Sequence, residues 1–130
     1  MQKVFYENKT MSSRYAELRD DATHVVSETE AFEHYFVARG QAKLVRGVTS
    51  QIRGLRERLN NWFIPASEQI ATIEAVLDFL DKVAADLKEQ YMSKLDANAD
   101  EWDVFAVYED TLYDTRQKVG DFKRYIVENK

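Results

Sequence analysis

Cysteine is missing from this 130-residue chain, and proline and glycine are scarce. Without cysteine the chain can form no disulfide, no thiolate metal site and no thiol nucleophile, which fits a reducing compartment. No run of about 18 apolar residues is present, and the first ten residues lack the apolar core of a signal peptide. These absences predict a soluble cytoplasmic protein with no membrane partner, folded as one domain around its own hydrophobic core.

With one proline and four glycines in the chain, long helices are the expected structure. Apolar residues separated alternately by three and four positions form two seams of the kind found where helices pack side by side. The first seam is Ile70, Ile73, Leu77, Leu80, Ala84, Leu87 and Tyr91. The second seam is Phe105, Tyr108, Leu112, Thr115, Val119, Phe122 and Ile126. We therefore expect helices at 67–95 and 101–128, joined as an antiparallel hairpin.

The segment 12–63 contains no proline and no obvious loop, although the phase of its apolar seam changes near Gly40. A continuous helix over this segment would be about 75 Å long, against about 40 Å for each later helix. Either the surplus length projects beyond the hairpin, or the helix breaks near Gly40. We favour the continuous rod, because residues 36–42 are poor in loop-forming residue types.

The predicted fold is therefore all-α. It is an elongated, coiled-coil-like antiparallel hairpin or bundle of three long helices, or of four helices if the first breaks near Gly40. Residues 12–130 form a single helical domain in this prediction. Residues 1–11, which include Val4, Phe5 and Tyr6, are expected to form an extended arm.

An Arg-Gly dipeptide recurs every seven residues, at Arg39-Gly40, Arg46-Gly47 and Arg53-Gly54. Seven residues are two helical turns, so in a continuous helix the arginines and the glycines would each form a column. A glycine inside a helix costs about 1 kcal/mol relative to alanine, so we expect close approach of another chain to offset that cost. Three interpretations stay open: a solvated basic face, a tight contact with a partner helix, and contacts to successive phosphates of nucleic acid.

Charge is distributed unevenly along the chain, whose net charge is −5. Six basic residues and one acidic residue lie between positions 39 and 58, so this segment carries a charge of +5. The basic residues are Arg39, Lys43, Arg46, Arg53, Arg56 and Arg58. Positions 96–114 hold seven acidic residues and no basic one. Such asymmetry predicts a partner of opposite charge, either a polyanion or the acidic segment of another copy.

Residue patterns typical of enzymes and metal sites are missing. His24 and His34 are ten residues apart, too far for a metal-binding pair on adjacent helical turns. Residues 96–100 match the first half of an EF-hand calcium loop, but Glu101 and Val107 replace the glycine and the bidentate glutamate that the loop needs. We therefore expect no enzyme activity, no metal and no cofactor.

Together these patterns predict a non-enzymatic, self-associating helical assembly or adaptor protein, whose partner is another copy of the chain or another helical protein. The six basic residues of the segment 39–58 would contact the partner. Gly40, Gly47 and Gly54 would allow its close approach. The alternative is an oligomeric nucleic-acid-binding protein that contacts phosphates through the same basic residues.

Overall fold

The computed structural model describes residues 11–61 and 65–128, and within these ranges the chain is helical and contains no strand. Its elements are α2 (Met11–Val37), α3 (Val48–Leu59), α4 (Ala66–Gln90), the short 3₁₀ helix η1 (Met92–Lys94) and α5 (Asp100–Glu128). The all-α prediction is confirmed. The predicted arm lies outside the described residues, apart from Met11, which begins α2.

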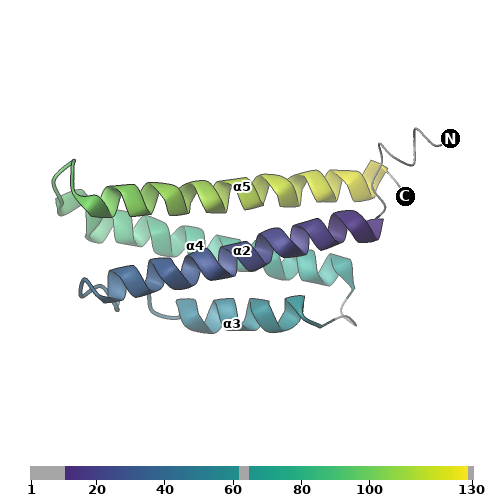
Figure 1. Cartoon of the computed structure of the whole chain (residues 1–130), viewed down its shortest axis with the longest axis horizontal. Coiled ribbons are helices and arrows are strands. Elements are labelled where there is room, and N and C mark those ends of the chain that lie inside the picture. The colour runs from purple at the N-terminus through teal and green to yellow at the C-terminus, as the bar shows by residue number, and fades with distance from the viewer. Residues whose placement is uncertain (1–10, 62–64, 129–130) are drawn as a thin grey trace.

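The four α-helices of the described residues pack together side by side, with successive helices running in opposite directions (Figure 1). Helix α2 packs against α3 and α5, and α4 packs against the same two helices. Consequently α3 and α5 lie diagonally across the packed helices and run in the same direction. Helix α3 has only 12 residues, whereas its three companions have 25 to 29.

The continuous helix that we favoured over 12–63 is wrong, because α2 ends at Val37 and α3 begins at Val48. Gly40 has a φ of 80°, in the left-handed region that glycine adopts without strain. Its N–H donates to the Val37 carbonyl at 3.0 Å, while the Gln41 N–H donates to the Phe36 carbonyl at 2.9 Å. These two hydrogen bonds form a Schellman motif, which ends a helix with a single left-handed residue and needs no polar loop.

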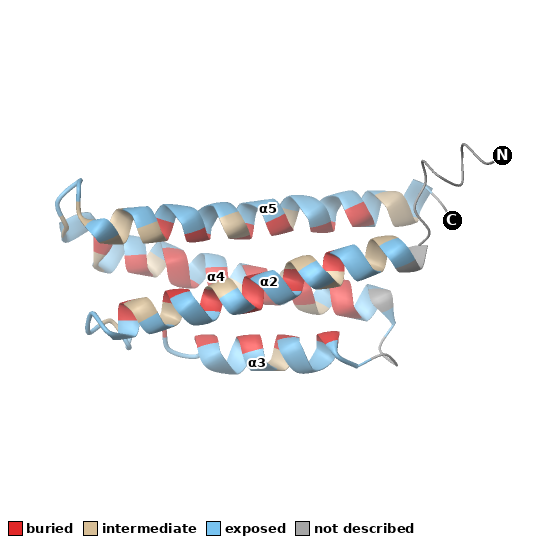
Figure 2. Ribbon diagram, viewed as in Figure 1, coloured by how far each residue is buried: buried red, intermediate tan, exposed pale blue. Residues whose placement is uncertain are grey.

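The predicted seams provide the buried core between the helices (Figure 2). Every residue of the seam on α4 is buried except Tyr91, and every residue of the seam on α5 is buried except Ile126; both exceptions are partly buried. Between Thr29 of α2 and Tyr108 of α5, the two hydroxyl oxygens lie 2.6 Å apart in this core. Burial is the main cause that raises the pKa of Tyr108, so its hydroxyl stays neutral.

Both ends of the short helix α3 are held by side chains from neighbouring helices. The Glu33 carboxylate of α2 accepts hydrogen bonds from the Thr49 backbone N–H at 3.1 Å and from the Thr49 hydroxyl at 2.7 Å. At the other end, the Gln69 amide of α4 donates to the carbonyls of Arg58 and Asn61, each at 3.0 Å. These bonds satisfy backbone groups that a helix terminus otherwise leaves without partners.

Candidate contact surface

Three of the six predicted contact cations are engaged inside the molecule. The Arg39 guanidinium stacks 3.5 Å from the Tyr35 ring centroid, and its Nε lies 3.9 Å from the Glu101 carboxylate. Arg56 of α3 forms an ion pair with Glu30 of α2. Arg58 donates from Nε to the Thr72 hydroxyl of α4 at 3.0 Å. These three arginines therefore attach the turn and α3 to the other helices.

The contact between Arg39 and Glu101 belongs to a small polar cluster at the end of the molecule where α5 begins. The Tyr91 hydroxyl donates to the Glu101 carboxylate at 2.9 Å. A hydrogen bond from its own backbone, the Tyr91 hydroxyl and the Arg39 charge lower the pKa of Glu101. Burial and the same carboxylate raise the pKa of Tyr91. The cluster thus holds an ionised glutamate against a cation where the α2–α3 turn meets α5.

The other three predicted cations, Lys43, Arg46 and Arg53, are exposed, and none of them forms an ion pair with any residue that the structure describes. Lys43 and Arg46 lie in the turn between α2 and α3, and Arg53 lies within α3. These residues do not form one column, since the turn separates the first two from Arg53. All three lie either in the turn that leads into α3 or on α3 itself, and we call them the basic surface.

The three glycines of the Arg-Gly repeat do not form one helical column either, so the premise of that prediction is wrong. Gly40 and Gly47 are turn residues with φ values of 80° and 86°, and only Gly54 lies inside a helix. A Cβ built on Gly47 would lie 3.3 Å from the Phe79 ring of α4, whereas one on Gly40 or Gly54 would meet nothing within 4 Å. Backbone conformation therefore explains the first two glycines, whereas no contact among the described residues explains Gly54.

Exposed carboxylates without an ion-pair partner among the described residues gather on the first half of α5. Those on its solvent-facing side are Asp103, Glu109, Asp110 and Asp114. The second half of α5 differs, because Arg116, Lys118 and Lys123 pair with carboxylates of neighbouring helices. We call these four carboxylates the acidic surface. It lies on the helix diagonally opposite α3.

Two grooves flank the exposed side of α2. The groove towards α3 is lined in part by His34, Val37 and Arg53. The groove towards α5 is lined in part by Tyr35, Asp103 and Val107. Val37 is 45% exposed and Val107 is 61% exposed, and they are two of the four large apolar side chains that are exposed in the described part of the chain. Apolar side chains thus accompany charged ones along both edges of α2.

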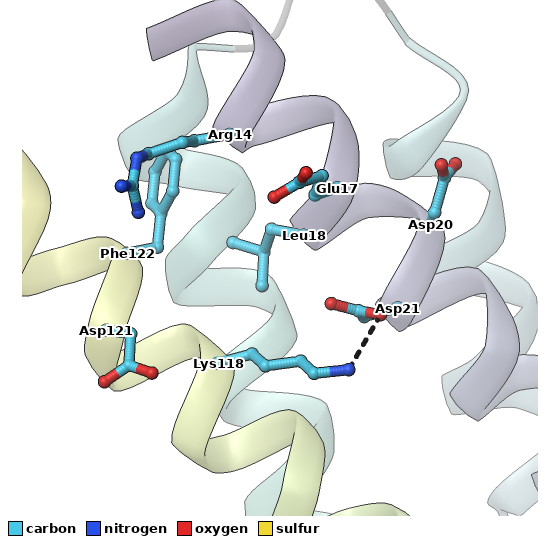
Figure 3. Close-up of a pocket in the computed structure, with 8 residues that line it drawn as sticks. All are labelled: Arg14, Glu17, Leu18, Asp20, Asp21, Lys118, Asp121 and Phe122. Atoms are coloured by element: carbon cyan, nitrogen blue, oxygen red, sulfur yellow. Dashed lines mark hydrogen bonds and ion pairs between the residues drawn. The ribbon is translucent and has the colours of Figure 1, made fainter. Parts of the chain in front are cut away.

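A further depression lies between α2 and α5 near the start of α2 and has a mixed lining (Figure 3). Lys118 forms an ion pair with Asp21 across it, with the two charged atoms 3.2 Å apart. The Arg14 guanidinium lies 4.1 Å from the centroid of the Tyr125 ring. Two cations, Arg14 and Lys118, line this depression together with four carboxylates, so its net charge is negative.

Within residues 11–61 and 65–128, no three histidine, aspartate or glutamate side chains come together as a candidate metal site. His24 is exposed beside Glu28 at 3.9 Å, and His34 lies at the groove between α2 and α3. The segment 96–100 is a turn that leads into α5 at Asp100. The prediction of a helix connection at this point is confirmed.

The exposed apolar residues beside α2 were missed by reasoning from the sequence. The sequence did contain a signal for Val107, because this apolar residue lies within an acidic segment and outside the buried seam of α5.

Comparison of the chain with family models, curated proteins and solved structures finds no significant match. None of the described helices is long and apolar enough to cross a membrane.

Proposed function

We propose that this chain is a non-enzymatic helical assembly or adaptor protein, coiled-coil-like in its packing, that associates with further copies of itself. The observation that carries the proposal is the separation of unpaired charge. The basic surface of Lys43, Arg46 and Arg53 lies on the α3 side, and the acidic surface lies on α5, diagonally opposite. The lack of cysteine favours the reducing cytoplasm as its location.

Charges on diagonal helices cannot neutralise each other within one molecule, whereas they can do so between two molecules. Each exposed ion pair contributes only about 0.2–1 kcal/mol, so several pairs must form together. Apolar contact adds to them, because Val37 and Val107 are exposed next to the charged residues. Electrostatic complementarity of this kind chiefly sets which partner is chosen and in what orientation.

Nucleic-acid binding is the alternative, and the exposure of the same three cations is the observation in its favour. Lys43, Arg46 and Arg53 have no carboxylate partner among the described residues to displace before they contact phosphates. Two observations favour the assembly instead. The chain has a net charge of −5, and its acidic surface would repel a long polyanion that extends beyond α3.

The proposal is tested by light scattering at low and high salt on the wild-type chain and on a variant with Lys43, Arg46 and Arg53 changed to glutamine. We expect the wild type to associate at low salt, and we expect the variant to associate more weakly. A matched control changes Lys82, Lys88 and Lys94 to glutamine and alters the net charge equally. Equal weakening by both variants would show that net charge alone matters, and the basic surface would have no specific role.

A mobility-shift titration with DNA and RNA at low salt separates the two functions. Three phosphate contacts on double-stranded DNA would give an affinity that falls with salt concentration with a log–log slope of about −3. We expect no such complex. A complex with that slope, abolished by the glutamine changes in the basic surface while the chain stays monomeric, would establish the alternative and exclude self-association.

A further inference from the structure

The exposed side of α2 carries a second seam, distinct from the buried one. Its residues follow steps of four, three, four and three, so they line up along the helix. They are Asp20, His24, Ser27, Ala31 and His34, and all five are exposed. Small side chains at Ser27 and Ala31 leave the middle of this seam flat. A flat helix with a groove on either side has the shape of a surface against which a second helix can pack.

The two edges of this surface carry opposite charge. In the groove between α2 and α3, Glu30 is paired with Arg56 and Glu33 is bonded to Thr49, so Arg53 is the charged side chain left without a partner. Asp103 lines the groove between α2 and α5. Figure 1 shows α2 in front, between α5 above and α3 below. The face centred on α2 therefore has an unpaired cation on its α3 edge, an uncharged centre at Ala31 and an unpaired carboxylate on its α5 edge.

The charged residues on the two edges also lie at matching heights along the molecule. On α2, Glu33 contacts Thr49 of α3, and Thr29 contacts Tyr108 of α5. Residues 29 and 33 are one helical turn apart, about 6 Å along the axis. Helices α3 and α5 both run opposite to α2, so moving one turn along α3 from Thr49 reaches the level of Thr29. Arg53 therefore lies level with Tyr108.

Asp110 follows Tyr108 by two residues, so it lies about 3 Å further along α5 than the level of Arg53. The ends of the edges correspond as well. Because Arg39 contacts Glu101, the α2–α3 turn that carries Lys43 and Arg46 lies at the same end as the start of α5. Basic and acidic residues therefore lie at matching heights at two places, at Arg53 and Asp110 and at the end where the α2–α3 turn meets the start of α5.

We propose that a second copy of this chain docks face to face on α2, related to the first by a two-fold axis parallel to the helices. Such a rotation places the α3 edge of each copy on the α5 edge of the other at the same height, so Arg53 meets Asp110 twice. A two-fold axis perpendicular to the helices would instead oppose the two acidic edges. The inference rests on the self-association proposed above and adds its partner surface, symmetry and contacts.

The contact is confined to the half of the molecule that holds Ala31. At the other end of α2, Asp20 would face its own copy across the axis, and like charges there disfavour close approach. Near the centre, Ala31 would meet Ala31 of the second copy. Val37 and Val107, one beside each groove, would lose their exposure to water, which supplies an apolar contribution that charge alone lacks.

The charge pairing is tested by reversal. Arg53→Glu replaces attraction by repulsion at two symmetry-related places, and we expect the dimer dissociation constant to rise about tenfold or more. Asp110→Arg should weaken the dimer similarly. The combined Arg53→Glu, Asp110→Arg variant should return to within about threefold of the wild type, because the attraction is restored with the signs exchanged. Matched controls on α4, Lys82→Glu and Glu89→Arg, should leave the dissociation constant unchanged.

The orientation is tested by disulfide formation, for which a chain without cysteine is suited. A cysteine at position 31 can reach only its own counterpart, and a disulfide requires Cα atoms within about 7 Å. We expect Ala31→Cys to form a covalent dimer under mild oxidation. The control Ala85→Cys, at an exposed position on α4, should stay monomeric.

The outcomes separate the two proposals. A wild-type chain that stays monomeric at every concentration overturns both self-association and this inference. A wild-type dimer whose dissociation constant ignores both Arg53→Glu and Asp110→Arg, or which shows no rescue in the combined variant, overturns the inference alone. So does a dimer in which the cysteines at 31 and 85 cross-link equally.

Discussion

Alanine substitution at the three glycines of the Arg-Gly repeat should change stability in opposite directions. Gly54 lies within α3, and a Cβ there would meet nothing within 4 Å. Gly54→Ala should therefore stabilise the protein by about 0.5–1 kcal/mol through helix propensity and the lower entropy of the unfolded chain. Gly40 is equally open but has a φ of 80°, so Gly40→Ala should destabilise the protein by about 1–2 kcal/mol.

Gly47→Ala should be the most destabilising of the three changes. Its φ of 86° carries the same conformational cost, and the added Cβ would lie 3.3 Å from the Phe79 ring, which must shift. Urea denaturation with an unchanged m value measures each free energy of unfolding. In a helix continuous through residues 38–47, all three changes would be stabilising, by about 3 kcal/mol in total. Stabilisation by Gly40→Ala and Gly47→Ala would therefore refute the break between α2 and α3.

Two further predictions concern the contacts of α5. Thr29→Val leaves the Tyr108 hydroxyl buried without its partner and should destabilise the protein by about 1–3 kcal/mol. The double variant with Tyr108→Phe should lose less free energy of unfolding than the two single variants summed. Additive losses in this double-mutant cycle would contradict the contact. The lowered pKa of Glu101 stabilises the fold above its unfolded value of about 4.3, and this stability is lost as the pH falls through the folded value. Stability measured against pH should therefore fall less steeply below about pH 4.5 in Glu101→Gln than in the wild type, and identical acid limbs would contradict this role.

The buried faces of α4 and α5 could be predicted from the sequence, because a helix that packs along one side must repeat its apolar residues at intervals of three and four whatever its partner is. The break after Val37 could not be predicted from loop composition. A Schellman motif requires one residue in the left-handed conformation, and Gly40 supplies it among residues that otherwise suit a helix. The sequence signal for the break was Gly40 itself, a glycine close to the point where the phase of the apolar seam changes.

The candidate surface was predicted only at the level of segments. Charge counting identifies a basic and an acidic segment, because the charge of a segment depends on the sequence alone. It could not show that Arg56 pairs with Glu30 and that Arg58 reaches Thr72, since these contacts exist only once α3 has packed between α2 and α4. Charge counting also could not distinguish Arg56 and Arg58 from Arg53. Arg53 remains exposed, and Asp110 of α5 lies at nearly the same height on the other side of α2.

Sedimentation equilibrium of the wild-type chain at low ionic strength measures self-association through separated charge without any substitution. The chain has a mass of 15.2 kDa. We expect an average mass that rises towards twice this value as the protein concentration increases, and that falls back as salt screens the exposed charges. A mass that stays at that of one chain across the whole concentration range, with and without salt, would contradict it.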